Sequence, residues 1–238
     1  MSSPALVTVA HGTRVAAGNR VAAAITAKAS RRLAVPAQGS YVELCDPGLT
    51  AVMRTLERPA VVVPLLLSTG FHMRADIPAA VSLAGTPVQV ARPLGPHPLL
   101  AEVMCLRLRA AGARVGDPVV LVAAGSRDPD AAIDLASAAR MLQSRWGAPV
   151  RVATLSGDGP CVMDAVAESR AGGGRVAAVP YLLASGHFSR RAQQLAAHAG
   201  ATTVADVLGP HPLVVELVVR RYRALAARPL SGLVTPAA

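Results

Sequence analysis

The most constraining feature of this sequence is an internal repeat. Segments of the first half return in the second half in the same order, at a nearly constant separation of about 114 residues. The matching stretches are residues 5–14 with 119–127, 64–74 with 180–190, and 94–99 with 208–213. Repeated order at one spacing indicates duplication of a single folding unit. We therefore expect an N-terminal domain at residues 1–115 and a C-terminal domain at residues 116–238.

Each half alternates short apolar stretches with longer helical patterns. We expect strands at residues 5–10, 38–44, 60–67 and 87–91, and helices at residues 19–33, 47–56, 77–83 and 98–111. Asp46 is expected to cap the second of these helices, with Pro47 as its first residue. The second half repeats the pattern, with strands near Val119, Val150, Arg175 and Thr202, and an irregular tail from Arg228. Such alternation predicts an α/β protein with two tandem doubly wound parallel-sheet domains.

Composition narrows the class of protein further. Hydrophobic residues make up 52% of the 238 residues and charged residues 16%, which excludes intrinsic disorder. Aromatic residues make up only 3%, which disfavours a nucleic-acid platform built on stacked rings. Three cysteines without a CxxC pair argue against a disulfide framework, and no apolar run approaches the roughly 18 residues of a membrane span. We expect a cytoplasmic protein that binds neither membrane nor nucleic acid.

The charge is strongly positive and almost entirely arginine. The net charge is +10, and Lys28 is the only lysine. Guanidinium groups pair well with carboxylate and phosphate, so the chain is suited to a polyanionic ligand. The arginines form no basic run, and charge alone leaves a polycarboxylate, a nucleotide or a nucleic acid open.

Three reactive side chains fall at or just beyond the expected strand ends of the first half. They are His11, Glu43 and His72. Carboxyl ends of parallel strands share one edge of a sheet, so we expect these side chains to converge. Two imidazoles and a carboxylate suit a divalent transition metal, and they also suit proton abstraction near neutral pH. In the second half we place Ala124, Thr154 and Phe188 at these positions, which predicts one active half and one degenerate half.

Residues 7–14, 42–47 and 63–78 together resemble the sirohydrochlorin chelatase family, in its two-domain duplicated form. The motif combines a strand running into His11-Gly12-Thr13-Arg14 with a later Gly70-Phe71-His72. The resemblance implies insertion of Fe²⁺ or Co²⁺ into sirohydrochlorin, on the way to siroheme or cobalamin. It implies that His11 and His72 are the catalytic histidines and that Glu43 is their acidic partner, the three together holding the metal. The divalent metal is then a substrate, and no permanently bound cofactor is expected.

The implied substrate is a polycarboxylate tetrapyrrole, which arginines in the strand-end loops would bind through charge-assisted hydrogen bonds. The candidate substrate-binding residues are Arg14, Arg74, Arg127, Arg190, Ser68, Thr69 and Gly70. We expect a monomer in which the two halves form one cleft.

Other readings stay open on sequence alone. The same fold would also suit a non-catalytic tetrapyrrole or metal-binding protein that holds or delivers its ligand. The Gly-Thr and Gly-Ser turns at residues 12–13 and 125–126 would also suit a phosphate-binding domain, although neither has the Walker pattern. His97 and His211 recur in Gly-Pro-His-Pro in both halves, and this symmetry favours a structural role for them.

Overall fold

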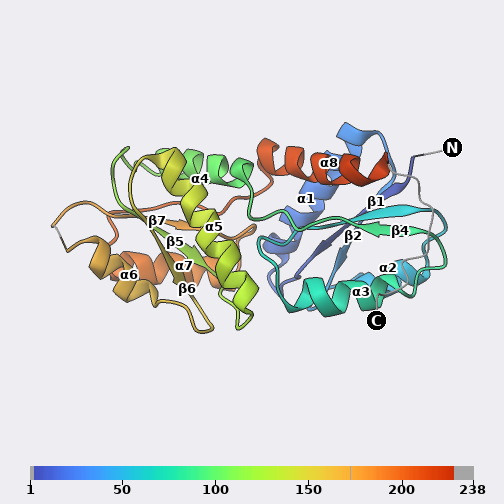
Figure 1. Cartoon of the computed structure of the whole chain (residues 1–238), viewed down its shortest axis with the longest axis horizontal. Coiled ribbons are helices and arrows are strands. Elements are labelled where there is room, and N and C mark those ends of the chain that lie inside the picture. The colour runs from blue at the N-terminus through green and yellow to red at the C-terminus, as the bar shows by residue number, and fades with distance from the viewer. Residues whose placement is uncertain (1–2, 172, 228–238) are drawn as a thin grey trace. The chain divides into compact units, whose positions relative to one another are not determined.

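The computed structural model describes residues 3–171 and 173–227, and the tail expected from Arg228 lies outside them. Within these residues the chain forms two parallel four-stranded sheets, of order β2-β1-β3-β4 and β6-β5-β7-β8 (Figure 1). This confirms the predicted fold class. The two sheets have the same order because the duplicated sequences follow the same path.

The chain divides into two compact units. The first unit contains the residues up to Leu94 together with those from Val214 onward, and the second contains Gly95–Leu213. The first has strands β1 (Ala5–Ala10), β2 (Ala37–Tyr41), β3 (Ala60–Pro64) and β4 (Val88–Val90), with helices α1 (Ala16–Leu33), α2 (Leu49–Arg54), the π-helical turn η1 (His72–Asp76), α3 (Ile77–Val81) and α8 (Pro212–Ala226). The second has β5 (Val119–Ala123), β6 (Val150–Thr154), β7 (Ala177–Pro180) and β8 (Thr203–Val204), with α4 (Pro98–Ala110), α5 (Pro129–Trp146), α6 (Val162–Ser169) and α7 (His187–His198).

Helices cover both faces of each sheet, as a nearly all-apolar central strand requires. In the first unit α2 and α3 pack their apolar side chains on one face of β1 and β3, and α1 lies on the other face with α8 (Figure 1). Both faces of β1 and β3 are buried along their whole length. These central strands end at the edge of the sheet that carries the reactive side chains.

The last helix of each sequence repeat packs in the unit formed by the other repeat. Helix α4 follows the strands of the first repeat but belongs to the second unit, and α8 belongs to the first. Within the first unit the Tyr222 hydroxyl donates to the Pro4 carbonyl (2.5 Å), and Arg221 Nε donates to the Pro93 carbonyl (3.0 Å). The division at residue 115 therefore describes the sequence repeats, and as a domain boundary it stays a prediction.

One local expectation is wrong. Helix α2 begins at Leu49 with Gly48 as its N-cap, so Asp46 does not cap it and Pro47 is not its first residue. The reason is that the Pro47 carbonyl accepts a hydrogen bond from the Tyr41 amide (3.0 Å). This bond keeps the segment extended beside the end of β2 for two more residues.

The recurring histidines are structural, as predicted. His97 Nδ1 accepts a hydrogen bond from the Leu99 amide (3.1 Å) at the start of α4, and His211 Nδ1 accepts one from the Leu213 amide (3.2 Å) at the start of α8. Each imidazole thereby satisfies a helix amide that would lack a partner.

Cys45, Cys105 and Cys161 are free thiols. Among the helices in the described ranges, none has the length and apolarity needed to cross a membrane.

Candidate metal centre

His11 and Glu43 lie on two loops that backbone contacts hold together. His11 directly follows β1, and Glu43 comes two residues after β2, the parallel neighbour of β1. The Glu43 amide donates to the His11 carbonyl (3.1 Å). Between the loops Gly12 has a φ of +95°, and a Cβ at this position would overlap the Glu43 carbonyl oxygen. Glycine is therefore required for the loops to approach this closely.

His72 reaches the same edge of the sheet from a helical turn. It is the first residue of η1, which runs to Asp76 and continues into α3. The Gly70 carbonyl starts the turn by accepting hydrogen bonds from the amides of Met73 (3.0 Å) and Arg74 (3.3 Å). Single turns of π-helix are rare and are frequently found at functional sites. The sequence predicted a loop up to His72 and did not predict this turn.

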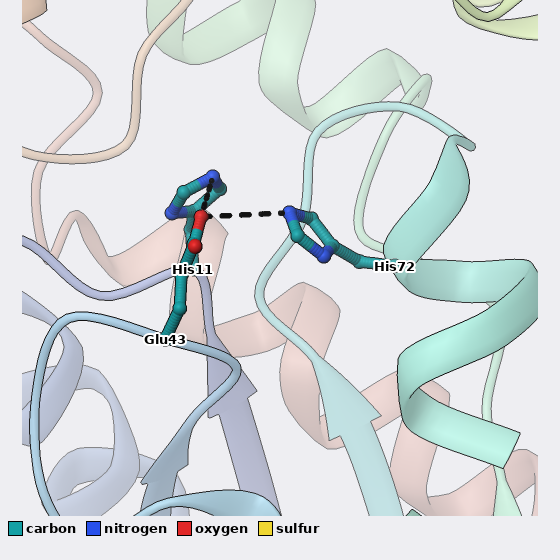
Figure 2. Close-up of side chains that lie close together, drawn as sticks. All are labelled: His11, Glu43 and His72. Atoms are coloured by element: carbon teal, nitrogen blue, oxygen red, sulfur yellow. Dashed lines mark ion pairs between the residues drawn. The ribbon is translucent and has the colours of Figure 1, made fainter. Parts of the chain in front are cut away.

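The three side chains converge as the sequence predicted (Figure 2). Glu43 Oε1 lies 3.1 Å from His11 Nε2 and 3.9 Å from His72 Nε2. The two imidazole rings meet edge to face, with centroids 4.8 Å apart. One donor atom from each residue lies within 4.8 Å of the others. Among the described residues this is the one group of three or more potential ligands that is close enough to hold a metal ion.

The cluster is open to solvent. The exposed fraction is 51% for the His11 side chain, 48% for Glu43 and 28% for His72. All three come from one edge of the sheet, so they would bind a metal ion from one side and leave its other coordination positions accessible. A closed structural metal site has no such accessible face. The arrangement therefore suits an ion that is passed on to another molecule.

Asp76 fixes the orientation of His72. Asp76 Oδ2 lies 2.6 Å from His72 Nδ1, and a carboxylate accepts this proton, so the free lone pair of a neutral His72 is on Nε2. That lone pair faces Glu43 Oε1 across a gap of 3.9 Å, which is too long for a hydrogen bond. Two electron-pair donors that face each other in this way are matched by a cation between them. A carboxylate on the far nitrogen of a metal-binding histidine is a recurrent arrangement.

Asn19, on α1, links the loops that carry His11 and Glu43. Its Oδ1 accepts a hydrogen bond from the Thr13 amide (3.1 Å), and its Nδ2 donates to the Thr13 carbonyl (2.7 Å). The same Nδ2 lies 3.1 Å from Cys45 Sγ. Nothing in the sequence pattern singles out Asn19 or Asp76, although a carboxylate four residues after a histidine is a usable signal once that segment is known to be helical.

The other candidate residues fall in both units. Arg14 and Arg74 are exposed on the segments that carry His11 and His72 in the first unit, whereas Arg127 and Arg190 are exposed at the corresponding places of the second. Ser68, Thr69 and Gly70 are partly buried in the segment between β3 and η1. Gly70 has a structural role, because its carbonyl accepts the first hydrogen bonds of the helical segment that contains His72. The substrate-binding roles of all seven residues stay predictions.

The second unit has the same loops without the ligands. Ala124 follows β5 where His11 follows β1, and Gly125 repeats both the positive φ (+91°) of Gly12 and its close approach to the neighbouring loop. The expectation that Thr154 matches Glu43 is wrong. Thr154 pairs with Ala123 as Tyr41 pairs with Ala10, which places Ser156 at the position of Glu43. Thr154 is the last paired residue of β6, whereas Glu43 lies two residues beyond the last paired residue of β2, so the two differ in register by two residues.

The fold and the cluster define an α/β protein with a twice-repeated parallel sheet and a candidate metal centre in its first repeat. A family model described as CbiX matches residues 5–111 and again residues 118–225, and the chain belongs to this family. The match confirms the resemblance to the sirohydrochlorin chelatases.

Known proteins similar to this chain agree with that assignment. A sirohydrochlorin ferrochelatase of Bacillus subtilis is 30% identical, over 94% of this chain and 92% of its own length. A sirohydrochlorin cobaltochelatase of Priestia megaterium is 25% identical, over 79% of this chain and 66% of its own length. The solved structure of SirB from Bacillus subtilis with Fe³⁺ is 28% identical, covers 95% of this chain and 96% of its own, and has a TM-score of 0.80. A CbiX structure from denitrifying bacteria, at 19% identity and a TM-score of 0.65, covers 93% of this chain and 99% of its own and shows the shared fold alone.

Proposed function

We propose that this chain is a chelatase that inserts a divalent metal ion, Fe²⁺ or Co²⁺, into sirohydrochlorin. The observation that carries the proposal is the convergence of His11, Glu43 and His72 donor atoms within 4.8 Å in a solvent-accessible cluster. Membership of the family and the names of the relatives supply the substrate. Because the relatives include both a ferrochelatase and a cobaltochelatase, both metals are tested.

The reaction exchanges two protons for one metal ion. The metal-free macrocycle carries two N–H protons in its centre, and both must leave as the divalent ion enters. We assign His72, oriented by Asp76, as the ligand that holds the ion with Glu43. We assign His11, the most exposed of the three side chains, as the base that accepts a proton once the ion has moved to the macrocycle. A second proton leaves to Glu43 or to water.

Arginines would hold the carboxylates of the substrate through charge-assisted hydrogen bonds. Arg14 and Arg74 are proposed for this role because they belong to the segments that carry His11 and His72. Arg127 and Arg190 are proposed on the weaker ground of equivalent positions in the second unit. Ser68 and Thr69 are proposed as polar contacts beside them.

The test is an anaerobic absorbance assay of sirohydrochlorin with Fe²⁺ or Co²⁺ at catalytic enzyme concentrations. We expect wild-type protein to convert many equivalents of substrate, and His11→Ala or His72→Ala to lower kcat/KM by about 100-fold or more. His198→Ala, an exposed histidine at the end of α7, is the matched control and should behave as wild type. Conversion that stops at one equivalent would favour a carrier. If the wild-type protein binds a nucleotide tightly and His11→Ala binds it equally well, the phosphate-binding hypothesis would be favoured.

A further inference from the structure

Two exposed apolar side chains adjoin the metal centre in sequence. Leu44 directly follows Glu43 and is 50% exposed, and Phe71 directly precedes His72 and is 68% exposed. The Phe71 ring centroid lies 6.4 Å from that of His72. Exposed apolar groups beside a polar cluster are typical of a site whose ligand has both apolar and polar parts.

Leu44 also has an unusual backbone conformation. Its φ is +63°, in the left-handed region, which is unfavourable for a residue with a branched side chain. Ala34 is the other described non-glycine residue with positive φ, and it ends helix α1, where this conformation is common. Leu44 ends no helix. Strained backbone of this kind is frequently found at functional sites.

The second repeat provides an internal comparison for Leu44. By strand register the equivalent residue is Gly157, which has a φ of +78° and so adopts the same conformation without strain. A Cβ at Gly157 would lie 2.7 Å from the Ser126 carbonyl oxygen, so the second unit leaves no room for a side chain there. The first unit, which carries the metal ligands, accommodates a leucine at the position where glycine would be easiest. Neither the fold nor core packing explains this leucine.

We propose that Leu44 and Phe71 form an apolar flank that contacts the flat conjugated ring of the tetrapyrrole while the metal centre faces its nitrogens. This inference rests on the proposed chelatase function, because it takes the macrocycle as the ligand. The apolar flank would bind the ring through burial of apolar surface, and the arginines would bind the carboxylates at its rim. The chain thereby recognises the two chemically different parts of one substrate with different side chains.

The test is a fluorescence titration of metal-free sirohydrochlorin with wild type, Leu44→Gly and Phe71→Ala, paired with a titration of Co²⁺ alone. We expect each substitution to raise the Kd for the macrocycle about fivefold and to leave Co²⁺ binding within about twofold of wild type. Leu44→Gly installs the residue that the second repeat has, so folding should be preserved. Leu44→Asn is a second variant that tolerates positive φ but is polar, and it should weaken macrocycle binding as well.

Leu83→Ala is the control, because Leu83 is 44% exposed in the same unit but adjoins none of the metal ligands. Its Kd for the macrocycle should equal that of wild type. The apolar flank is refuted if Leu44→Gly and Phe71→Ala bind the macrocycle as wild type does, or if they weaken Co²⁺ binding equally. If either result is obtained while the wild-type protein still converts many equivalents of sirohydrochlorin, the proposed function is unaffected. A wild type that neither binds sirohydrochlorin nor metallates it overturns the flank and the proposed function together.

Discussion

Asp76 shows how much one hydrogen bond determines in this site. Its contact with His72 Nδ1 selects the ring nitrogen that faces Glu43, and removing it frees the imidazole to rotate and to exchange tautomers. We expect Asp76→Ala to lower Co²⁺ affinity and kcat/KM by 10-fold or more, on the order of the 10–100-fold losses typical of such partners. Asp76→Glu should recover part of the loss. Co²⁺ titration followed by visible absorbance measures the affinity directly.

Glu57→Gln is the control for that experiment, because it removes an exposed carboxylate elsewhere in the same unit. If Asp76→Ala binds Co²⁺ as wild type does, Asp76 does not orient a metal ligand. If Glu57→Gln shows the same loss, the effect is one of general charge and not of the contact with His72.

Sequence reasoning at the residue scale predicted the three candidate ligands that the structure brings together, but not the residues hydrogen-bonded around them. His11, Glu43 and His72 were predictable because parallel strands end at one edge of a sheet, a property of topology. Asp76 was not, since its contact requires His72 and Asp76 to share a helical turn that the Gly70-Phe71 sequence does not indicate. The mistaken match of Thr154 to Glu43 has a similar cause, because strand register is a contact between chain segments and cannot be read from one strand's ends.

At the scale of elements, helix α8 is held to α1 within the first unit by ionic contacts. Glu216 Oε2 lies 2.6 Å from Arg32 on α1, and Oε1 accepts a hydrogen bond from Arg220 Nε (2.7 Å). The hydrogen bond from Arg220 and the charge of Arg32 lower the pKa of the Glu216 carboxyl below its ordinary value of 4.5. The ion pairs therefore stabilise the folded state fully above pH 4.5, and this contribution is lost as the pH falls through the lower folded-state pKa.

We expect Glu216→Gln to lower the free energy of unfolding by about 0.5–1 kcal/mol at pH 7, the upper range for partly exposed pairs. The difference from wild type should shrink as the pH falls below 4.5, because the wild-type carboxyl becomes protonated. Urea unfolding at a series of pH values measures this. Glu168→Gln removes the partner of Arg151 from a more exposed pair in the second unit and should change stability less at every pH. A Glu216→Gln difference that grew on acidification would contradict the prediction.

The strand–helix alternation was predictable at this scale, but the exchange of the last helices was not. Hydrophobic periodicity indicates that residues 98–111 and 212–226 form amphipathic helices, but it does not indicate which sheet each helix covers. Because the repeats are related by duplication, either helix carries a similar apolar face, and the sequence does not reveal which unit it packs in. The contacts of Tyr222 with Pro4 and of Arg221 with Pro93 decide this in the folded chain.

At the scale of the whole molecule, the chain has two copies of one sheet topology and the candidate metal ligands on only one of them. The loops after β5 and β6 keep the geometry that brings His11 and Glu43 together, since Gly125 approaches the Ser156 carbonyl as Gly12 approaches that of Glu43. The positions of the three ligands are held in the second unit by Ala124, Ser156 and Phe188. The degenerate half therefore lacks the candidate ligand side chains but keeps the two loops that correspond to those of His11 and Glu43. At the third position Phe188 lies in a regular α-helix, where His72 lies in a π-helical turn.

This leads to a prediction about metal stoichiometry. Wild-type protein should bind one equivalent of Co²⁺ per chain, and the triple variant Ala124→His, Ser156→Glu, Phe188→His should bind a second. The second ion should bind more weakly, because Ala192 stands where Asp76 orients His72. A triple variant with Thr154→Glu in place of Ser156→Glu should stay at one equivalent, since strand register turns that side chain to the position of Tyr41. Isothermal titration calorimetry with Co²⁺ measures both stoichiometries. Two equivalents in both triple variants would show that the register does not determine the site, and one equivalent in both would show that the second unit has lost the framework as well as the ligands.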